Sequence, residues 1–167
     1  MAWGSQFLRK DQWTKPLWER GPFKSGPTSA PLDLQAGEQG FVVQAMNLEA
    51  LFTNAASTLF SHLTEKIAVK GIKILAGKTV EVAGATPTEL LGNWLNVLLS
   101  LLARQGMVCT DYDILEIDER HIEVEVEGEE YNARCHKLNM LIKRVPADKV
   151  RLEKANGLWR AVVVYET

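Results

Sequence analysis

A Thr-Pro-Thr-Glu run at residues 86–89 is the strongest local constraint on the fold of this chain. Thr86 suits a helix N-cap, Pro87 suits the first helical position, and Glu89 can bond back to the cap, so that backbone N–H groups at the helix start are satisfied. Apolar residues then recur at three- and four-residue steps, the spacing of one helix face. The sequence therefore predicts a helix that is buried on most sides, with Trp94 packed against a sheet. Its apolar residues are Leu90, Leu91, Trp94, Leu95, Val97, Leu98, Leu99, Leu101 and Leu102, and its narrow polar stripe is Glu89, Asn93, Asn96 and Ser100.

An earlier helix is indicated between Asn47 and Thr64. Asn47 is a suitable N-cap, and residues 40–45 just before it are dense in β-branched and aromatic side chains, which favours a strand. The apolar side chains of the helix fall on one stripe, so we expect that stripe to face a sheet. They are Leu48, Leu51, Phe52, Ala55, Leu59 and Leu63.

Apart from the helix that begins at Thr86, the rest of the chain after residue 64 favours strands. Three glutamates alternate with apolar residues over 121–127, which puts carboxylates on the solvent face of a strand at intervals of about 6.5 to 7 Å. Because the two helices are segregated from these strands, we expect an α+β fold with a mostly antiparallel sheet. The expected strands are 66–75, 78–82, 114–116, 121–127, 139–145, 149–154 and 158–166, with a hairpin turn at 155–157.

Length and composition exclude several classes of protein. The 167 residues fit one domain, and contents of 46% hydrophobic and 24% charged residues are those of a folded protein. A net charge of -2 argues against a whole surface adapted to nucleic acid. Cys109 and Cys135 are too sparse for a disulfide framework, and the longest apolar stretch is interrupted by Asn93 and Asn96. We therefore expect a cytoplasmic protein with reduced thiols and no membrane partner.

Residues 1–34 differ from the rest of the chain. They hold four of the six prolines and three of the five tryptophans, and they lack a sustained helix or strand period. We expect a flexible tail over 1–34 and one domain over 35–167. The tail interleaves aromatic and cationic side chains, which suits weak contact with single-stranded RNA, whereas the alternative is docking on its own domain or on a protein partner. These residues are Trp3, Trp13, Trp18, Arg9, Lys10, Lys15 and Arg20.

Known catalytic motifs are missing from the sequence. It contains neither a phosphate-binding glycine motif, nor a Gly-x-Ser-x-Gly nucleophile motif, nor a His-Glu-x-x-His zinc motif. Cys135 and His136 are neighbours on an expected extended segment, so they should point to opposite faces and not act together. His62 and His121 likewise have no second ligand at metal spacing. We expect a protein that is not an enzyme.

Two segments resemble the two helices of the archease family, in the same order and at a similar separation: residues 47–56 and 89–99. Residues 128–131, 136–138 and Lys143, together with the ending at 159–167, also resemble that family's pattern, and the resemblance covers roughly residues 35 to 167. It implies two helices packed on a mostly antiparallel sheet. It also implies a non-enzymatic accessory factor that binds the RNA ligase of tRNA splicing and assists its guanylylation and turnover.

Archeases carry a carboxylate metal site, and the resemblance places its two acidic positions at Glu38 and Glu166. Each glutamate stands where the family has an aspartate, which lengthens the reach of the carboxylate by about 1.5 Å. A calcium, magnesium or manganese ion takes several oxygen ligands, which these two side chains, the terminal carboxylate of Thr167, backbone carbonyls and water can supply. The alternative is a pair of solvated glutamates at the ends of their segments.

Other family positions differ in this chain. Lys143 is retained, and the resemblance implies that it is a ligase-activating residue, but Leu141 stands for a glutamate, Pro146 for a threonine and Asp148 for a histidine. A second hypothesis is therefore an interaction module that keeps the fold without metal or ligase-activating chemistry. A third hypothesis, a small hydrolase that uses paired carboxylates, has only the same two acidic positions in its support.

Overall fold

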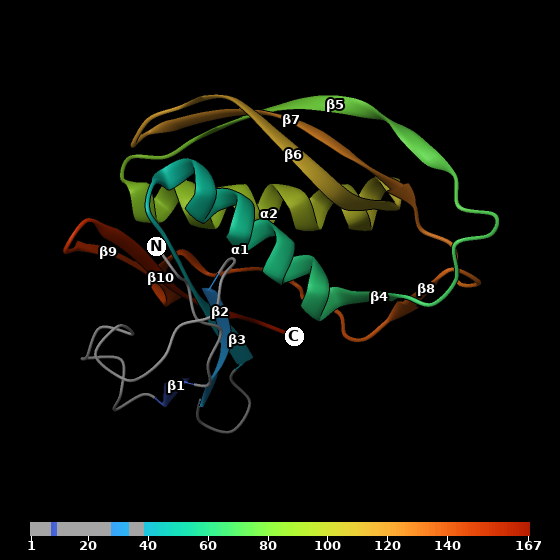
Figure 1. The fold of residues 1–167 in the computed structure, drawn as a ribbon, viewed down its shortest axis with the longest axis horizontal. Coiled ribbons are helices and arrows are strands. Elements are labelled where there is room, and N and C mark those ends of the chain that lie inside the picture. Colours follow the sequence, from blue (N-terminus) through green and yellow to red (C-terminus); the bar gives the residue numbers. More distant parts are fainter. Residues whose placement is uncertain (1–7, 10–27, 34–38) are drawn as a thin grey trace.

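Two helices lie between two antiparallel sheets in the computed structural model, which describes residues 8–9, 28–33 and 39–167. Figure 1 shows the layers: β5, β6 and β7 above, the helices in the middle, and β3, β9 and β10 below. In chain order the elements are β1 (Leu8–Arg9), β2 (Thr28–Asp33), β3 (Gln39–Ala45), α1 (Leu48–Leu63), β4 (Thr64–Lys66), β5 (Ile74–Ala83), α2 (Pro87–Gln105), β6 (Met107–Ile117), β7 (His121–Glu130), β8 (His136–Leu138), the 3-10 turn η3 (Ala147–Lys149), β9 (Val150–Ala155) and β10 (Leu158–Tyr165).

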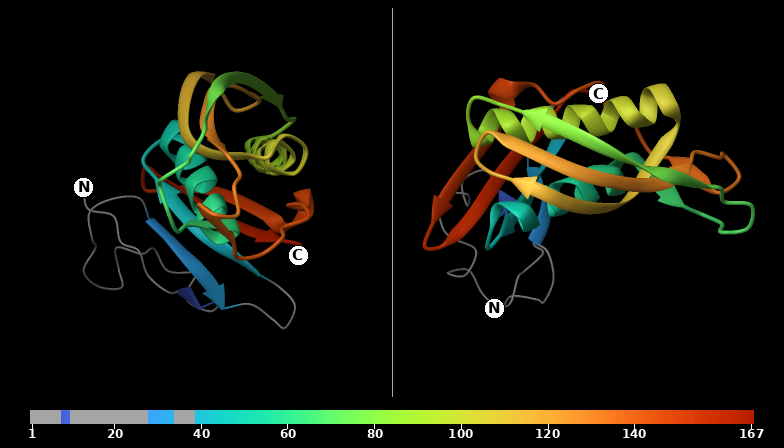
Figure 2. Two further views of the ribbon diagram at one scale, coloured as in Figure 1. Left: turned by 90° about the vertical axis from the view of Figure 1, so that its right-hand side faces the viewer. Right: turned by 90° about the horizontal axis from the view of Figure 1, so that it is seen from above.

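The strands form three separate sheets, ordered β1-β2-β3-β10-β9, β5-β7-β6 and β4-β8. Every pairing between these strands is antiparallel except that of β1 with β2. Helix α1 contacts β3 and β6, and α2 contacts β5, β6 and β9, so both helices are covered from two sides, as the left-hand view in Figure 2 also shows. The predicted α+β class is confirmed, with the helix layer enclosed by sheets rather than resting on one.

Both helices begin where their capping residues predict. Asn47 Oδ1 accepts a hydrogen bond from the Ala50 N–H at 2.7 Å, and Thr86 Oγ1 accepts one from the Glu89 N–H at 3.1 Å. Helix α2 ends at Gly106, whose φ of 63° is the left-handed conformation that favours glycine at a helix C-terminus. None of the helices in the described ranges combines the length and apolar character needed to cross a membrane.

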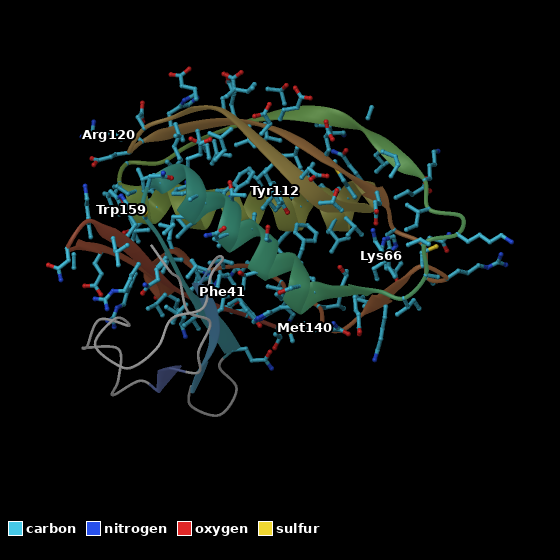
Figure 3. All side chains as sticks on the ribbon, viewed as in Figure 1. Phe41, Lys66, Tyr112, Arg120, Met140 and Trp159 are labelled. Atoms are coloured by element: carbon cyan, nitrogen blue, oxygen red, sulfur yellow. The ribbon has the colours of Figure 1, made fainter. Side chains whose placement is uncertain are left out.

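The core is centred on Trp94, which is fully buried. Its indole N–H donates to the Phe52 carbonyl of α1 at 3.1 Å, and its ring meets Tyr112 of β6 edge-on, with centroids 5.9 Å apart. Trp94 therefore joins α2 to the other helix and to the upper sheet, which confirms the predicted packing. Figure 3 shows Tyr112 pointing from the sheet toward the helices.

The solvent face of the β5-β7-β6 sheet is acidic, as the alternation in 121–127 predicts. The apolar residues of β7, Ile122, Val124 and Val126, are fully buried below it. Carboxylates on neighbouring strands stand directly opposite one another, and like charges in that register oppose pairing. The opposed pairs are Asp111 with Glu127, Asp113 with Glu125, Glu116 with Glu123, and Glu81 with Glu123.

Two predicted strands are wrong in part. Instead of one strand over 66–75, β4 ends at Lys66 and β5 begins at Ile74. The loop between these two strands projects at one end of the molecule (Figure 1). Residues 139–145 form a single bridge, at Arg144, instead of a strand. Both segments are rich in apolar residues and contain β-branched ones, which favours strands, but composition alone does not supply a partner for the backbone.

The predicted tail lies mostly outside the described residues. Within 1–34 the structure describes only β1 and β2, and β2 pairs with β3 from Thr28 opposite Gln44 to Pro31 opposite Phe41. The tail tryptophans and the cations Lys10, Lys15 and Arg20 lie outside the described residues, whereas Arg9 is described as part of the backbone of β1.

Replacing Trp94 with alanine is expected to destabilise the protein by about 3 to 5 kcal/mol, because the change opens a cavity and leaves the Phe52 carbonyl without its donor. The measurement is the free energy of unfolding from urea titration. Trp159→Ala is the matched control, since Trp159 is only partly buried and stacks under Lys154 at 5.3 Å. Equal losses in the two variants would contradict the central position of Trp94.

Candidate functional site

The C-terminal end of the chain is paired with the segment that carries Lys143. The Lys143 N–H donates to the Glu166 carbonyl at 2.8 Å, and the Glu166 N–H donates to the Arg144 carbonyl at 3.0 Å. This pairing brings Lys143 and Glu166, two candidates that are distant in the sequence, onto neighbouring segments of the chain. Thr167 follows Glu166 and is exposed.

Arg144 binds the carboxylate of Glu166 with two hydrogen bonds. Its Nε lies 2.9 Å from Oε2 and its Nη2 lies 3.2 Å from Oε1, the parallel geometry that suits guanidinium and carboxylate. These bonds lower the pKa of Glu166, with smaller contributions from Lys149 and Lys143, and they raise the pKa of Arg144. The side chains are 64% and 44% exposed, so the pair orients the carboxylate more than it stabilises the fold.

The position of this pair is set by Asn96 of α2. Asn96 Oδ1 accepts from the Val145 N–H at 2.8 Å, and its Nδ2 donates to the Val145 carbonyl at 2.9 Å. One side-chain amide therefore replaces the strand partner that residues 139–145 lack. Asn93 similarly donates to the Ala83 carbonyl at 2.9 Å, from a partly exposed position on the polar stripe of α2.

A carboxylate metal site is not completed by the described residues. Between residues 39 and 167, no three His, Cys, Asp or Glu side chains are placed so that they could hold a metal ion. Glu38 lies outside the described residues, and both oxygens of Glu166 are occupied by Arg144. A metal ion at Glu166 would therefore compete with the guanidinium of Arg144. The metal site at Glu38, Glu166 and Thr167 stays a prediction.

A histidine and a tyrosine lie just behind the pair. His62 Nδ1 is 2.7 Å from the Tyr165 hydroxyl, and the same hydroxyl is 3.6 Å from Met140 Sδ. Burial lowers the pKa of His62 and raises the pKa of Tyr165, which keeps both groups neutral. Figure 3 places Met140 beside the C-terminal end of α1, and Phe41 packs against both rings. This group packs the last strand onto α1 and does not form a catalytic pair.

A second polar cluster was not predicted by the sequence. Glu129 of β7 is buried and accepts hydrogen bonds from His136 Nε2 at 2.9 Å and from Lys66 Nζ at 2.7 Å. Lys66 is labelled in Figure 3. His136 Nδ1 accepts from the Asn132 N–H at 3.1 Å, so the Nε2–H donates to Glu129. The three side chains tie the small β4-β8 sheet to β7, and only the tertiary fold brings them together.

The cysteines have the inert character expected of them. Both are free and buried. Cys135 Sγ donates to the Lys70 carbonyl at 3.3 Å, whereas His136 contacts Glu129. Cys135 lies in the turn just before β8 and not on the extended segment that the sequence predicts. Burial raises the pKa of Cys109 to about 12, which leaves its thiol protonated and unreactive.

Glu129→Gln is expected to cost about 1 to 3 kcal/mol of stability near neutral pH, because it weakens the bonds that satisfy His136 and Lys66. Burial raises the pKa of Glu129, but the bonds and charges of Lys66 and His136 outweigh it, so the pKa lies below its ordinary value of 4.5. The Glu129 contribution is therefore complete above the unfolded-state pKa and is lost as the pH falls through the lowered folded-state pKa.

The measurement is urea unfolding of the wild type and Glu129→Gln across this acidic range. Glu130→Gln is the control, because Glu130 is half exposed and only reaches Lys73 at 3.4 Å. A stability difference between wild type and Glu129→Gln that does not shrink on acidification would contradict the role of the charged carboxylate.

Comparison with known proteins places this architecture in a family. The archease protein family model matches residues 36–166. The protein archease of Methanosarcina mazei is 31% identical over 135 residues, which cover 75% of this chain and 87% of that protein. The protein archease of Methanopyrus kandleri is 26% identical over 132 residues, with 77% and 92% covered.

Solved structures share the fold. The solution structure of Methanobacterium thermoautotrophicum protein 1598 matches with a TM-score of 0.65 at 23% identity, covering 83% of this chain and 98% of that one. The crystal structure of a Thermotoga maritima archease, described as a possible chaperone, matches with a TM-score of 0.57 at 13% identity, covering 80% and 93%. Because the family model spans residues 36–166, and thus every element from β3 to β10, this chain belongs to the archease family.

Proposed function

We propose that this protein is a cytoplasmic, non-enzymatic accessory factor that docks on the RNA ligase of tRNA splicing and assists its guanylylation and turnover. The observation that carries the proposal is the convergence of Lys143 with the paired Arg144 and Glu166 at one exposed edge. Lys143 and Glu166 are positions at which the resemblance to archeases implies activity, and they meet in space although they are far apart in the sequence. The Thermotoga maritima relative is described as a possible chaperone, which agrees with assistance to another protein.

The accessory role needs a charged surface that is held in place before the partner arrives. Asn96 fixes the backbone at Val145, and Glu166 fixes the guanidinium of Arg144. Lys143 is exposed on the same segment, so its ammonium can meet a carboxylate or phosphate group at the ligase active site. Preorganised charge of this kind acts by positioning, and it requires no bond making by the accessory protein itself.

The second hypothesis, an interaction module without metal or ligase-activating chemistry, is favoured by one observation. Arg144 occupies both oxygens of Glu166, which is the only acidic metal candidate among the described residues. In that case the same edge still binds a partner, but it does not change the rate of guanylylation. Both hypotheses therefore predict that a partner binds at this edge, but only the first predicts faster guanylylation of the ligase.

Lys143→Ala is expected to lower stimulation of ligase guanylylation at least about tenfold, equivalent to roughly 1.4 kcal/mol of lost transition-state positioning. The assay follows transfer of the guanylyl group to the purified tRNA-splicing ligase of the same organism, with and without the accessory protein. Lys154→Ala is the matched control, because Lys154 lies on β9 over Trp159, outside the Lys143–Glu166 pairing. If the wild type binds this ligase without accelerating guanylylation, the interaction-module hypothesis replaces the proposal.

The metal prediction is tested separately by thermal unfolding in calcium, magnesium and manganese. Since a cation at Glu166 competes with Arg144, we expect a weak shift in the melting temperature of the wild type and a larger one in Arg144→Gln. Glu166→Gln is expected to remove both shifts, because a ligand stabilises the native state only through the groups that bind it. Unfolding that ignores all three ions in the wild type and in Arg144→Gln contradicts a metal site at this edge.

A further inference from the structure

An apolar groove opens beside the Lys143 segment. It lies among the C-terminal half of α2, β8 and residues 138–142, and it encloses a cavity of about 210 Å³. Its lining is almost wholly aliphatic, and it includes Leu63, Leu99, Leu102, Tyr131, Leu138 and Leu141. Leu141 is 70% exposed and Leu138 is 40% exposed at its rim, an unusual placement for two leucines around one hollow.

The groove continues into a basic one. A second hollow shares Leu99, Ala103 and Ile142 with the first, and its lining adds Arg104, Lys143 and Arg144. No carboxylate belongs to the described lining of either hollow, although Glu166 pairs with Arg144 at the margin. A partner that enters the groove therefore meets aliphatic side chains at one end and three cations at the other.

We propose that this continuous groove is the docking site for an acidic segment of a protein partner, which inserts an aliphatic side chain between Leu138 and Leu141 and places carboxylates against Arg104 and Lys143. The identification of that partner as the ligase rests on the proposed function, whereas the chemistry of the segment rests on the groove alone. A buried apolar anchor bordered by complementary charge is the usual composition of a strong interaction site.

The dimensions and lining favour a protein segment over other occupants. The apolar hollow of about 210 Å³ holds one or two side chains, and the adjoining basic hollow of about 410 Å³ leaves room for the carboxylates of the same segment. RNA bases are recognised by stacking on aromatic or guanidinium planes. The only aromatic ring in the described lining is Tyr131, one face of which is stacked on His136 at 5.8 Å. Of the two guanidinium groups in the lining, that of Arg144 is held by Glu166, which leaves only Arg104 as a free-standing plane for a base.

The first test needs no ligase. Random peptides displayed on phage are selected on the wild-type protein, with Leu141→Glu as the counter-selection. We expect enrichment of peptides in which one aliphatic residue lies close to Asp or Glu, and synthetic versions should bind Leu141→Glu and Arg104→Glu at least about tenfold more weakly, a loss of roughly 1.4 kcal/mol. Leu141 and Arg104 are both exposed, so neither change should unfold the domain.

Leu115→Glu is the matched control, because Leu115 is a 50% exposed leucine on β6 outside the groove. The peptides should bind Leu115→Glu as they bind the wild type. Affinity should also fall with added salt, and the slope should be smaller in Arg104→Glu, since the cations supply the charge. Peptides without an acidic preference, or peptides that bind Leu141→Glu undiminished, would overturn the proposal.

The second test measures binding of the purified ligase to the same three variants by calorimetry. If wild type binds and only Leu141→Glu and Arg104→Glu lose affinity, the groove is the ligase site. If the ligase binds all variants equally while acidic peptides still select the groove, the partner is another protein, and the proposed function stands without this surface. If the ligase does not bind at all, the proposed function fails while the peptide result still decides the groove.

Two other occupants give distinct results that would overturn the proposal. A second copy of the chain in the groove predicts a concentration-dependent dimer on gel filtration that Leu141→Glu dissociates. RNA in the groove predicts that a labelled single-stranded oligonucleotide binds the wild type and that unlabelled acidic peptide displaces nothing. Either outcome replaces the acidic segment as the occupant.

Discussion

The burial of α2 between two sheets is the constraint on which the rest of the structure depends. The helix is covered by β6 on one side and by β9 on another, and Trp94 bonds it to the backbone of α1. A helix enclosed in this way has little solvent-facing surface, so its few polar side chains must find partners within the protein. Asn93 and Asn96 do so by holding backbone segments that have no complete strand pairing. The core helix is therefore also the support of the candidate site.

That support explains why the exposed edge has a defined geometry. Residues 139–145 have one bridge to the C-terminal end, and a segment with so few backbone bonds would ordinarily open easily. The two bonds of Asn96 and the bidentate pair of Arg144 with Glu166 anchor it at consecutive residues. The same pair bears on the predicted metal site, because a metal ion at Glu166 would compete with the guanidinium of Arg144 for the carboxylate.

The charges of the molecule are segregated between two faces. On the β5-β7-β6 face, carboxylates on neighbouring strands lie opposite one another, which weakens the strand pairing. The groove beside α2 is instead lined by Arg104, Lys143 and Arg144. The net charge of -2 conceals this separation. A partner with an acidic segment would be attracted to the groove and repelled by the sheet face, so the arrangement favours one orientation of docking. Leu141, which stands where the family pattern has a glutamate, adds an apolar rim to the positive end.

Local signals in the sequence determined the parts of this protein that depend on neighbours along the chain. The caps at Asn47 and Thr86, the helix stripes, the buried Trp94 and the solvent side of β7 were all predictable, because capping and periodicity act within a few residues. The hairpin at Asn156 and Gly157 was predictable for the same reason, since both residues have the positive φ that such a turn requires.

Only the tertiary structure decided which segments meet. Residues 139–145 have the apolar content of a strand, but Val145 has the side-chain amide of Asn96 as its backbone partner, and no local pattern reports a bond across that separation. The same holds for Glu129, which is buried because β4 and β8 deliver Lys66 and His136 to it, and for Glu166, whose partner is Arg144 instead of an ion. The apolar groove likewise exists only where α2, β8 and the Lys143 segment converge. Hydrogen-bond partners and cavities are properties of packed surfaces, so they follow from the fold and not from the order of residues nearby.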